Sequence, residues 1–183
     1  TRLSRGLGDV YKRQEMNKRG FDADFRATGQ TGIFIAGSGV SIDAVVADFI
    51  SGAVEWLCPE NSENHWDIVE GQGSLFNVSY AGVTLGLIHG SQPDAIVVCH
   101  EAGRPHMRSM PHFPLIDLPT CIDFNLQAAR LTNPDVRCVG AAINTSRLSE
   151  EEGRVFCDKI SQEIGLPAVD PLRDGVASLV DQI

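Results

Sequence analysis

The stretch WDIVEGQGSLFN, at residues 66–77, limits the possible folds of this chain more than any other segment. A short apolar run ends there in an acid, two glycines and a hydroxyl group: Glu70, Gly71, Gly73 and Ser74. In an α/β protein this pattern predicts a buried strand that carries its acid to the carboxyl edge of a parallel sheet, where ligands bind. The alternative is a tight strand-to-helix turn in which the acid only accepts hydrogen bonds from backbone donors.

The chemistry of these four residues suits a bound anion and a cation. Glycines let backbone N–H groups approach a bound group closely, because no Cβ stands in the way. A carboxylate at the end of a strand is well placed to hold Mg²⁺, directly or through water. We therefore predict that Glu70 is a metal-associated acid, and that Gly71, Gly73 and Ser74 bind a cofactor.

Strand and helix patterns alternate along the rest of the chain. Short apolar runs predict strands at residues 23–28, 66–70, 95–99, 138–143 and 166–169. Apolar residues at helical spacing predict helices at residues 41–57, 79–89, 117–131, 149–164 and 175–183. Residues 100–119, rich in proline, histidine and arginine, are predicted to form a long loop. The alternation predicts an α/β fold of three layers, in which helices cover both faces of a parallel sheet.

Polar side chains suited to ligand binding stand at the end of each predicted strand. In chain order they are Arg26, Thr28 and Gln30; Glu70 and Ser74; His100, Glu101 and Arg104; Asn144 and Thr145; and Asp170, Pro171 and Arg173. Each of them, taken alone, is also explained as a helix cap or a turn residue. Because the carboxyl ends of parallel strands meet at one edge of a sheet, we expect these side chains to share one crevice.

The composition argues against several classes of partner. A formal net charge of −9 over 183 residues disfavours non-specific binding to nucleic acid or to anionic membranes. No apolar run approaches the ~20 residues of a membrane span, and no secretory signal pattern is present. The five cysteines are scattered and form no CxxC pair, which indicates reduced thiols. We expect a cytoplasmic homo-oligomer that acts on a small molecule.

Residues 1–14, TRLSRGLGDVYKRQ, differ from the rest of the chain. They carry four basic residues and one acid, although the whole chain is acidic. The string DVYKRQ also resembles the translation of a sequencing-library transposon end. We therefore predict a non-native segment here and a domain that spans residues 15–183. The alternative is a native basic amphipathic segment.

Two phosphate-binding patterns are missing from the sequence. It contains neither a GxxxxGK[ST] loop nor a GxGxxG that follows a strand and opens a helix. Residues 15–19 read as the last turns of a helix that Gly20 ends. The strand and glycine-rich loop that normally precede such a helix would lie upstream. We therefore expect a domain that is truncated at its N-terminus and binds nucleotides weakly or not at all by itself.

Several longer motifs together carry a family resemblance over residues 15–183. They are ATGQTGI, VVADFISGAVEWL, WDIVEGQGSLFN, AGVTLGLIHGSQPDAIVVCHE, RPHM, LTNP and VGAAINTS. The chain resembles the C-terminal domain of the D-glutamate N-acetyltransferase-like family, long known as a domain of unknown function. It is more distantly similar to dethiobiotin synthetase. The resemblance implies a P-loop NTPase-like domain that follows an N-terminal Rossmann-like domain. It also implies transfer of an acetyl group from acetyl-CoA to the amine of D-glutamate.

The same resemblance implies roles for individual residues. Glu70 matches the Mg²⁺-associated acid of the synthetase, and Asp43 lies near a second such acid. Asn144 matches a residue that faces an adenine ring, and Pro171 is expected beside the same cofactor. The side chains that the resemblance and the strand ends together assign to substrate binding are Arg26, Thr28, Gln30 and Arg108. An adenine and pyrophosphate site suits acetyl-CoA as well as ATP, so either is expected as the cofactor, with Mg²⁺.

Acetylation of an amine needs a base, donors for an oxyanion and cations for an acidic substrate. The candidate bases are His100 and Glu101. The backbone N–H groups of residues 71–73 are candidate donors, and Arg104 or Arg108 is a candidate partner for the substrate carboxylates.

Three other functions remain open from the sequence alone. A zinc site is suggested by five residues close together: Cys99, His100, Glu101, His106 and His112. Their spacing, HE-x4-H, differs from the HExxH that places two histidines on one helical face. An ATP- and Mg²⁺-dependent ligase or kinase is the second alternative. The third is a non-catalytic domain that binds nucleotide or supports oligomerisation.

Overall fold

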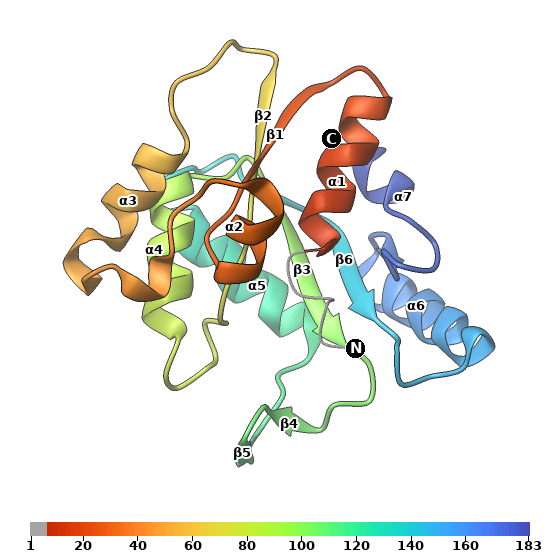
Figure 1. The fold of residues 1–183 in the computed structure, drawn as a ribbon. Helices are drawn as coiled ribbons and strands as arrows, with labels where there is room; N and C mark the ends of the chain where they lie inside the picture. The colour runs from red at the N-terminus through yellow and green to blue at the C-terminus, as the bar shows by residue number, and fades with distance from the viewer. Residues whose placement is uncertain (1–6) are drawn as a thin grey trace. The chain divides into compact units, whose positions relative to one another are not determined.

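The computed structural model describes residues 7–183 and divides them into two compact units (Figure 1). The first unit contains the residues up to Pro93 together with Ala128–Pro134. The second contains Asp94–Gln127 and Asp135–Ile183. Each unit has its own parallel sheet, so the predicted α/β class with parallel strands is confirmed. The strands form two hydrogen-bonded parallel sheets rather than one.

The first unit is built on two parallel strands. Its elements are α1 (Leu7–Lys18), β1 (Asp22–Arg26), α2 (Gln30–Ala36), α3 (Ile50–Leu57), β2 (His65–Val69) and α4 (Ala81–Ser91). Strands β1 and β2 pair in register from Asp22 opposite His65 to Arg26 opposite Val69. Both strands therefore end at the same level, and the residues after them emerge at one edge.

Close packing between α3 and α4 forms the apolar centre of this unit. Ile42, Ile50, Val54 and Leu87 form a buried cluster there. On α4, a Cβ at Gly86 would lie 2.4 Å from Cγ2 of Ile50, and one at Gly90 would lie 2.4 Å from the carbonyl oxygen of Ser51. These distances are shorter than van der Waals contact, so glycine at both positions lets the two helices approach closely.

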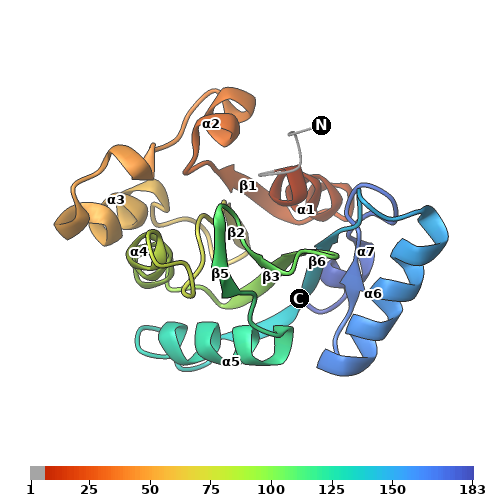
Figure 2. The same cartoon turned by 90° about the horizontal axis from the view of Figure 1, so that it is seen from below.

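The second unit contains a three-stranded parallel sheet and a short hairpin. The sheet has the order β3-β6-β7, with β3 (Ala95–Glu101), β6 (Arg137–Asn144) and β7 (Ala168–Val169). The hairpin pairs β4 (His106–Met107) with β5 (Met110–Pro114). The helices are α5 (Leu118–Ala129), α6 (Glu150–Ile164) and α7 (Ala177–Val180), seen beside the sheet in Figure 2. Residues of β3, β6, α5 and α6 share one buried cluster.

Local sequence signals at α6 are confirmed. Ser149 accepts a hydrogen bond from the amide of Glu152, and the Glu152 side chain accepts one from the amide of Ser149. The helix ends at Gly165, which adopts the left-handed conformation with φ of 67°. The backbone N–H of Ser149 also lowers the pKa of the Glu152 carboxyl, because this bond favours the charged form.

Two predicted segments differ most from the structure, and the last strand and helix are also shorter than predicted, at Ala168–Val169 and Ala177–Val180. The helix predicted over 41–57 begins only at Ile50, after two short 3-10 turns at Ile42–Ala44 and Ala47–Phe49. Val45 and Val46 between them have ψ angles of 135° and 136°, values outside the helical range. The predicted loop at residues 100–119 contains the β4–β5 hairpin and the end of β3. Its prolines exclude a helix but not an edge pairing.

Helix α1 includes residues 7–14, whose composition indicates a foreign origin. Val10 and Met16 are buried on this helix. Arg13 holds a buried Nε atom that has no hydrogen-bond partner among the described residues. The non-native origin of this segment stays a prediction. Within residues 7–183, no helix combines the length and apolar character needed to cross a membrane.

Candidate functional site

Glu70 lies directly after β2, with only 5% of its surface exposed. Its Oε2 atom accepts two backbone hydrogen bonds, from the amides of Thr28 and Gly29, both at 2.9 Å. These donors follow β1, so the carboxylate joins the ends of both strands. No hydrogen bond from residues 7–183 reaches the second oxygen, Oε1. Glu70 therefore binds backbone donors through Oε2, as the turn interpretation predicts, and Oε1 is available to another partner.

Thr28 is fully buried beside this acid. Its hydroxyl donates to the backbone carbonyl of Glu70 at 2.7 Å. Its own carbonyl accepts the amide of Ile42 at 3.0 Å, which anchors the segment that carries Asp43. Thr28 therefore holds the backbone around the acid in place. Asp43 itself is exposed, and its carboxylate accepts a hydrogen bond from the Ser41 hydroxyl at 2.6 Å. The pairing of Asp43 with Glu70 at a metal stays a prediction.

Glycine 32, on α2, leaves space for the carboxylate of Glu70. A Cβ at this position would lie 2.1 Å from Oε2 and 2.7 Å from Cδ of Glu70. Side-chain atoms essentially never approach so closely, so any larger residue must displace the acid. Neighbouring Gln30, the first residue of α2, is exposed.

Gln72 also takes part in this site, although its residue type and spacing do not predict such a role. Its Nε2 donates to the carbonyl of Thr28 and lies 3.0 Å from the Thr28 hydroxyl. Its backbone carbonyl accepts the Thr84 hydroxyl at 2.8 Å, which ties this loop to α4. One feature of the sequence could have indicated this role: Gln72 stands between two glycines and is the only residue of that short turn with a side chain.

The other residues of this loop shape its backbone. Gly73 has a φ of +69°, and a Cβ there would lie 2.9 Å from the Thr84 hydroxyl oxygen, so this position favours glycine. The Ser74 hydroxyl accepts the amide of Phe76 at 3.2 Å, a local turn contact. Gly71 borders open space. The cofactor contacts predicted for these three residues stay predictions.

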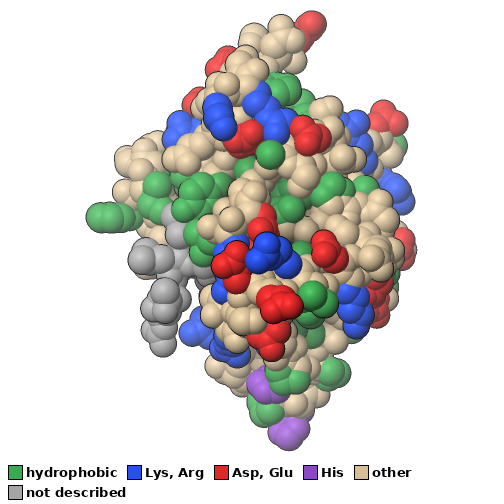
Figure 3. Space-filling model, turned by 90° about the vertical axis from the view of Figure 1, so that its right-hand side faces the viewer, with side chains coloured by type: hydrophobic (Ala, Val, Ile, Leu, Met, Phe, Trp, Pro, Cys, Tyr) green, Lys and Arg blue, Asp and Glu red, His purple; other side chains and the backbone are tan. Residues whose placement is uncertain are grey.

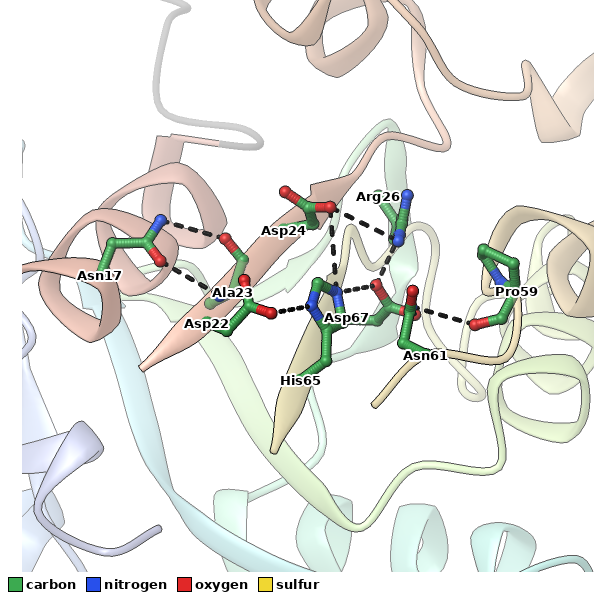
Figure 4. Close-up of polar contacts among 9 residues, drawn as sticks. All are labelled: Asn17, Asp22, Ala23, Asp24, Arg26, Pro59, Asn61, His65 and Asp67. Carbon is green, nitrogen blue, oxygen red and sulfur yellow. Dashed lines mark hydrogen bonds and ion pairs between the residues drawn. The ribbon is translucent and has the colours of Figure 1, made fainter. Parts of the chain in front are cut away.

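Arg26 belongs to a charged cluster on one face of the β1–β2 pair (Figure 4). Its Nε lies 2.6 Å from Oδ1 of Asp67, and its Nη2 lies 3.6 Å from Oδ2 of Asp24. The same two acids contact His65, whose Nδ1 also lies 3.0 Å from Asp22. The guanidinium of Arg26 is therefore held in ion pairs, and it can bind a substrate only by leaving them.

His65 makes the stability of the first unit depend on pH. Its side chain is 8% exposed, and the hydrogen bond to Asp22, followed by that to Asp67, raises its pKa. Its contribution is fully present below the unfolded value of about 6.5 and is lost as pH rises through the folded pKa. We expect the urea midpoint to fall between pH 6 and pH 9 more in the wild type than in His65→Gln.

The matched control for this prediction is His112→Gln, at an exposed position of the hairpin. It is expected to keep the wild-type dependence on pH. Equal slopes for His65→Gln and the wild type would show that the cluster does not stabilise the protonated ring.

In the second unit, His100 lies near the end of β3. Its ring stacks on Phe156 with centroids 6.1 Å apart and an interplanar angle of 5°. Burial, and then the charge of Arg104, lower the pKa of His100 below its usual value. The imidazole is therefore neutral at pH 7. It forms no hydrogen bond with the described part of the chain, so its nitrogens are open to a ligand.

Glu101 is held between two arginines. Its Oε2 forms an ion pair with Arg104, and its Oε1 lies 3.2 Å from Nε of Arg147. Because both oxygens contact guanidinium groups, the acid can accept a proton from a substrate only by breaking an ion pair. Of the two candidate bases, His100 is the one whose geometry leaves it available.

The end of β6 repeats the arrangement found at the end of β1. Thr145 is fully buried, and its amide donates to Oδ2 of Asp170 at 3.0 Å; its hydroxyl bonds the same oxygen. Asp170 follows β7, so this acid also joins two neighbouring strand ends. Asn144 accepts the amide of Ser146 at 3.0 Å, and Pro171 is half-buried. Their contact with an adenine ring stays a prediction.

The hairpin presents further candidates. Arg108 stands exposed in its turn, and no ion pair links it to residues 7–183. His106 bonds the carbonyl of Met107 through Nδ1 at 2.8 Å. Among the described residues no group of three or more His, Cys, Asp or Glu side chains is placed to bind a metal ion.

The structure shows the environment of three thiols and the distribution of charged side chains on one face. Burial raises the pKa of Cys58, Cys121 and Cys157 to about 11, so these thiols stay protonated at neutral pH. On the face seen in Figure 3, acidic and basic side chains are interspersed without a broad basic area.

The two candidate groups lie in different units. Those after β1 and β2 belong to the first, and those after β3, β6 and β7 belong to the second. Each group is assembled by side chains within its own unit. The single shared crevice stays a prediction.

Comparison with known proteins places the chain in a family. Residues 10–180 match the family described as "Domain of unknown function (DUF1611_C) P-loop domain". Two relatives are named D-glutamate N-acetyltransferase: one from Pseudoalteromonas sp, 58% identical over 90% of this chain, and one from Tritonibacter scottomollicae, 50% identical over 92%. A crystal structure of a DUF1611 family protein from Anabaena variabilis is similar, with a TM-score of 0.91 and 34% identity over 100% of this chain.

The chain spans about half the length of these proteins: 50% and 51% of the two relatives and 54% of the crystallised protein. The parallel α/β architecture and the match over residues 10–180 agree. The chain therefore belongs to the DUF1611 family and contains its C-terminal P-loop domain.

Proposed function

We propose that this chain is part of an enzyme that transfers the acetyl group of acetyl-CoA to the amine of D-glutamate. The observation that carries the proposal is the identity of 58% and 50% to two relatives named D-glutamate N-acetyltransferase. At half the length of those relatives, the chain supplies one part of the protein. The activity is a property of the full-length enzyme.

His100 is the proposed general base. A neutral imidazole accepts the proton of the substrate ammonium, and the freed amine then attacks the thioester carbonyl. The new N–C bond forms and the C–S bond breaks. Of the two protons that the nitrogen loses, the leaving thiolate of CoA takes up one and the other is released to solvent. Two observations support this role: the lowered pKa of His100, and the absence of a hydrogen bond between its ring and residues 7–183.

Arginines of the second unit are proposed to hold the acidic substrate. D-Glutamate carries two carboxylates, and guanidinium groups bind carboxylates with two parallel hydrogen bonds. Arg108 is the candidate without an ion pair inside the described chain. Arg104 is held by Glu101, so its proposed role is to place positive charge beside His100.

Glu70 is proposed to hold a cation. Magnesium is commonly bound by one or two carboxylates together with waters and phosphate oxygens. A buried carboxylate with one oxygen pinned and the other open fits that donor set. When bound, the ion would neutralise phosphate charge on the cofactor.

The experiment uses the full-length enzyme with acetyl-CoA and either D- or L-glutamate. Mass spectrometry is expected to detect N-acetyl-D-glutamate, with release of one thiol for each product. ATP consumption that depends on substrate, without any acetylated product, would overturn the proposal in favour of a ligase or kinase.

A further inference from the structure

We propose that Gln72 is a positioning residue that fixes the carboxylate of Glu70 so that Oε1 faces a bound cation. This inference rests on the cation-binding role proposed for Glu70. It concerns a side chain to which neither the sequence motifs nor the family relationship gives a role.

The direction of the hydrogen bonds around Thr28 is fixed by chemistry. An amide NH₂ group can only donate, and a backbone carbonyl can only accept. The Thr28 hydroxyl lies 3.0 Å from Gln72 Nε2 and 2.7 Å from the Glu70 carbonyl oxygen. The hydroxyl therefore accepts from Gln72 and donates to Glu70. The opposite orientation of the Gln72 amide would place its oxygen against the Thr28 carbonyl, which also only accepts.

This chain of bonds holds the donors that bind Oε2. Gln72 Nε2 also donates to the carbonyl of Thr28, whose amide binds Oε2. With the Thr28 and Gly29 amides held in place, Oε2 is committed and the carboxylate plane is set. The remaining oxygen is then presented in one direction.

Space around Gly29 places Gln72 and the open oxygen close together. A Cβ at Gly29 would lie 3.3 Å from Gln72 Nε2 and 3.5 Å from Glu70 Oε1. Both side chains therefore border the same small region. Glu70 is 95% buried, and no donor among residues 7–183 reaches Oε1, so this oxygen is available to a cation.

The chemistry of Oε1 suits two cations. One is a divalent metal such as Mg²⁺, and the other is the ammonium group of the amino-acid substrate. Both need a fixed anionic oxygen, and both lose affinity when the carboxylate is free to rotate. The experiment therefore measures the two separately.

The test uses Gln72→Met in the full-length protein, because methionine keeps the length of the side chain and removes the donor. Calorimetry follows Mn²⁺ binding without substrate, and D-glutamate binding without metal. We expect one of the two affinities to fall about 10- to 100-fold, as for other residues that orient a metal ligand. Gln127→Met is the matched control, since within the described residues Gln127 bonds only Asp123, and both are exposed on α5. It is expected to change neither affinity.

Two further measurements separate positioning from simple loss of structure. The thermal midpoint of Gln72→Met is expected to stay within a few degrees of the wild type, while Glu70→Gln removes the same cation affinity completely. Unchanged affinity for both cations in Gln72→Met would overturn the proposal. A fall in affinity matched by the Gln127→Met control would overturn it as well. These outcomes are independent of acetyl transfer, so an enzyme with another activity would leave the test intact.

Discussion

Replacing His100 with glutamine in the full-length enzyme is expected to lower kcat about 10²- to 10⁴-fold, the usual contribution of a general base. Glutamine keeps polarity and approximate size but accepts no proton at neutral pH. KM for D-glutamate is expected to change little, because the carboxylates of the substrate bind elsewhere. Steady-state kinetics with thiol detection measure both constants.

The pH profile gives this prediction its second readout. Burial lowers the pKa of His100, so the wild-type rate is expected to fall only at a pH below about 6.5, when the ring becomes protonated. The variant is expected to lack this acidic limb. His112→Gln serves as the control and should keep both rate and profile. A His100→Gln enzyme with wild-type kcat would remove His100 from the mechanism.

Gly32→Ala is expected to destabilise the protein by about 2–4 kcal/mol, through overpacking and loss of buried hydrogen bonds. The added methyl group would stand 2.1 Å from Oε2 of Glu70. The carboxylate must then leave the amides of Thr28 and Gly29, of which the Thr28 amide is buried. The free energy of unfolding in urea measures the loss, and cation binding at Glu70 is expected to vanish with it.

A second glycine provides the control for this substitution. Gly52, within α3, borders open space, so a Cβ there meets no atom within 4 Å. Gly52→Ala is expected to stabilise the protein by about 0.5–1 kcal/mol, because alanine favours the helix. If Gly32→Ala behaved like Gly52→Ala, the contact between α2 and Glu70 would not exist in solution.

Local pattern was enough to predict the strand ends and one helix cap. Three features were predicted from residues within a few positions of each other: the acid that follows β2, the capping box at Ser149 and the left-handed Gly165. Parallel pairing also followed from the alternation of strands and helices. These features were predictable because their signals are short-range.

Contacts between distant segments were not predictable in this way. The backbone donors to Glu70, Thr28 and Gly29, stand 42 and 41 positions earlier in the chain. No pattern in the residues around 28–29 or around Glu70 indicates that the two segments are in contact. The same holds for the ion pairs that hold Arg26 and Glu101. The hairpin was missed because its turn residue, Ser109, has a φ of 61° without the glycine or asparagine that usually marks such a turn.

The division of the chain has a consequence for attempts to dissect it. Residues Ala128–Pro134 belong to the first unit, although they interrupt the sequence of the second. Asn133 bonds the carbonyl of Pro93 at 3.1 Å, and His89 bonds that of Ala128 at 3.2 Å. A cut after Pro93 would therefore remove part of the first unit and leave those two side chains without their partners. Neither unit corresponds to a contiguous fragment, so expression trials should avoid splitting the gene there.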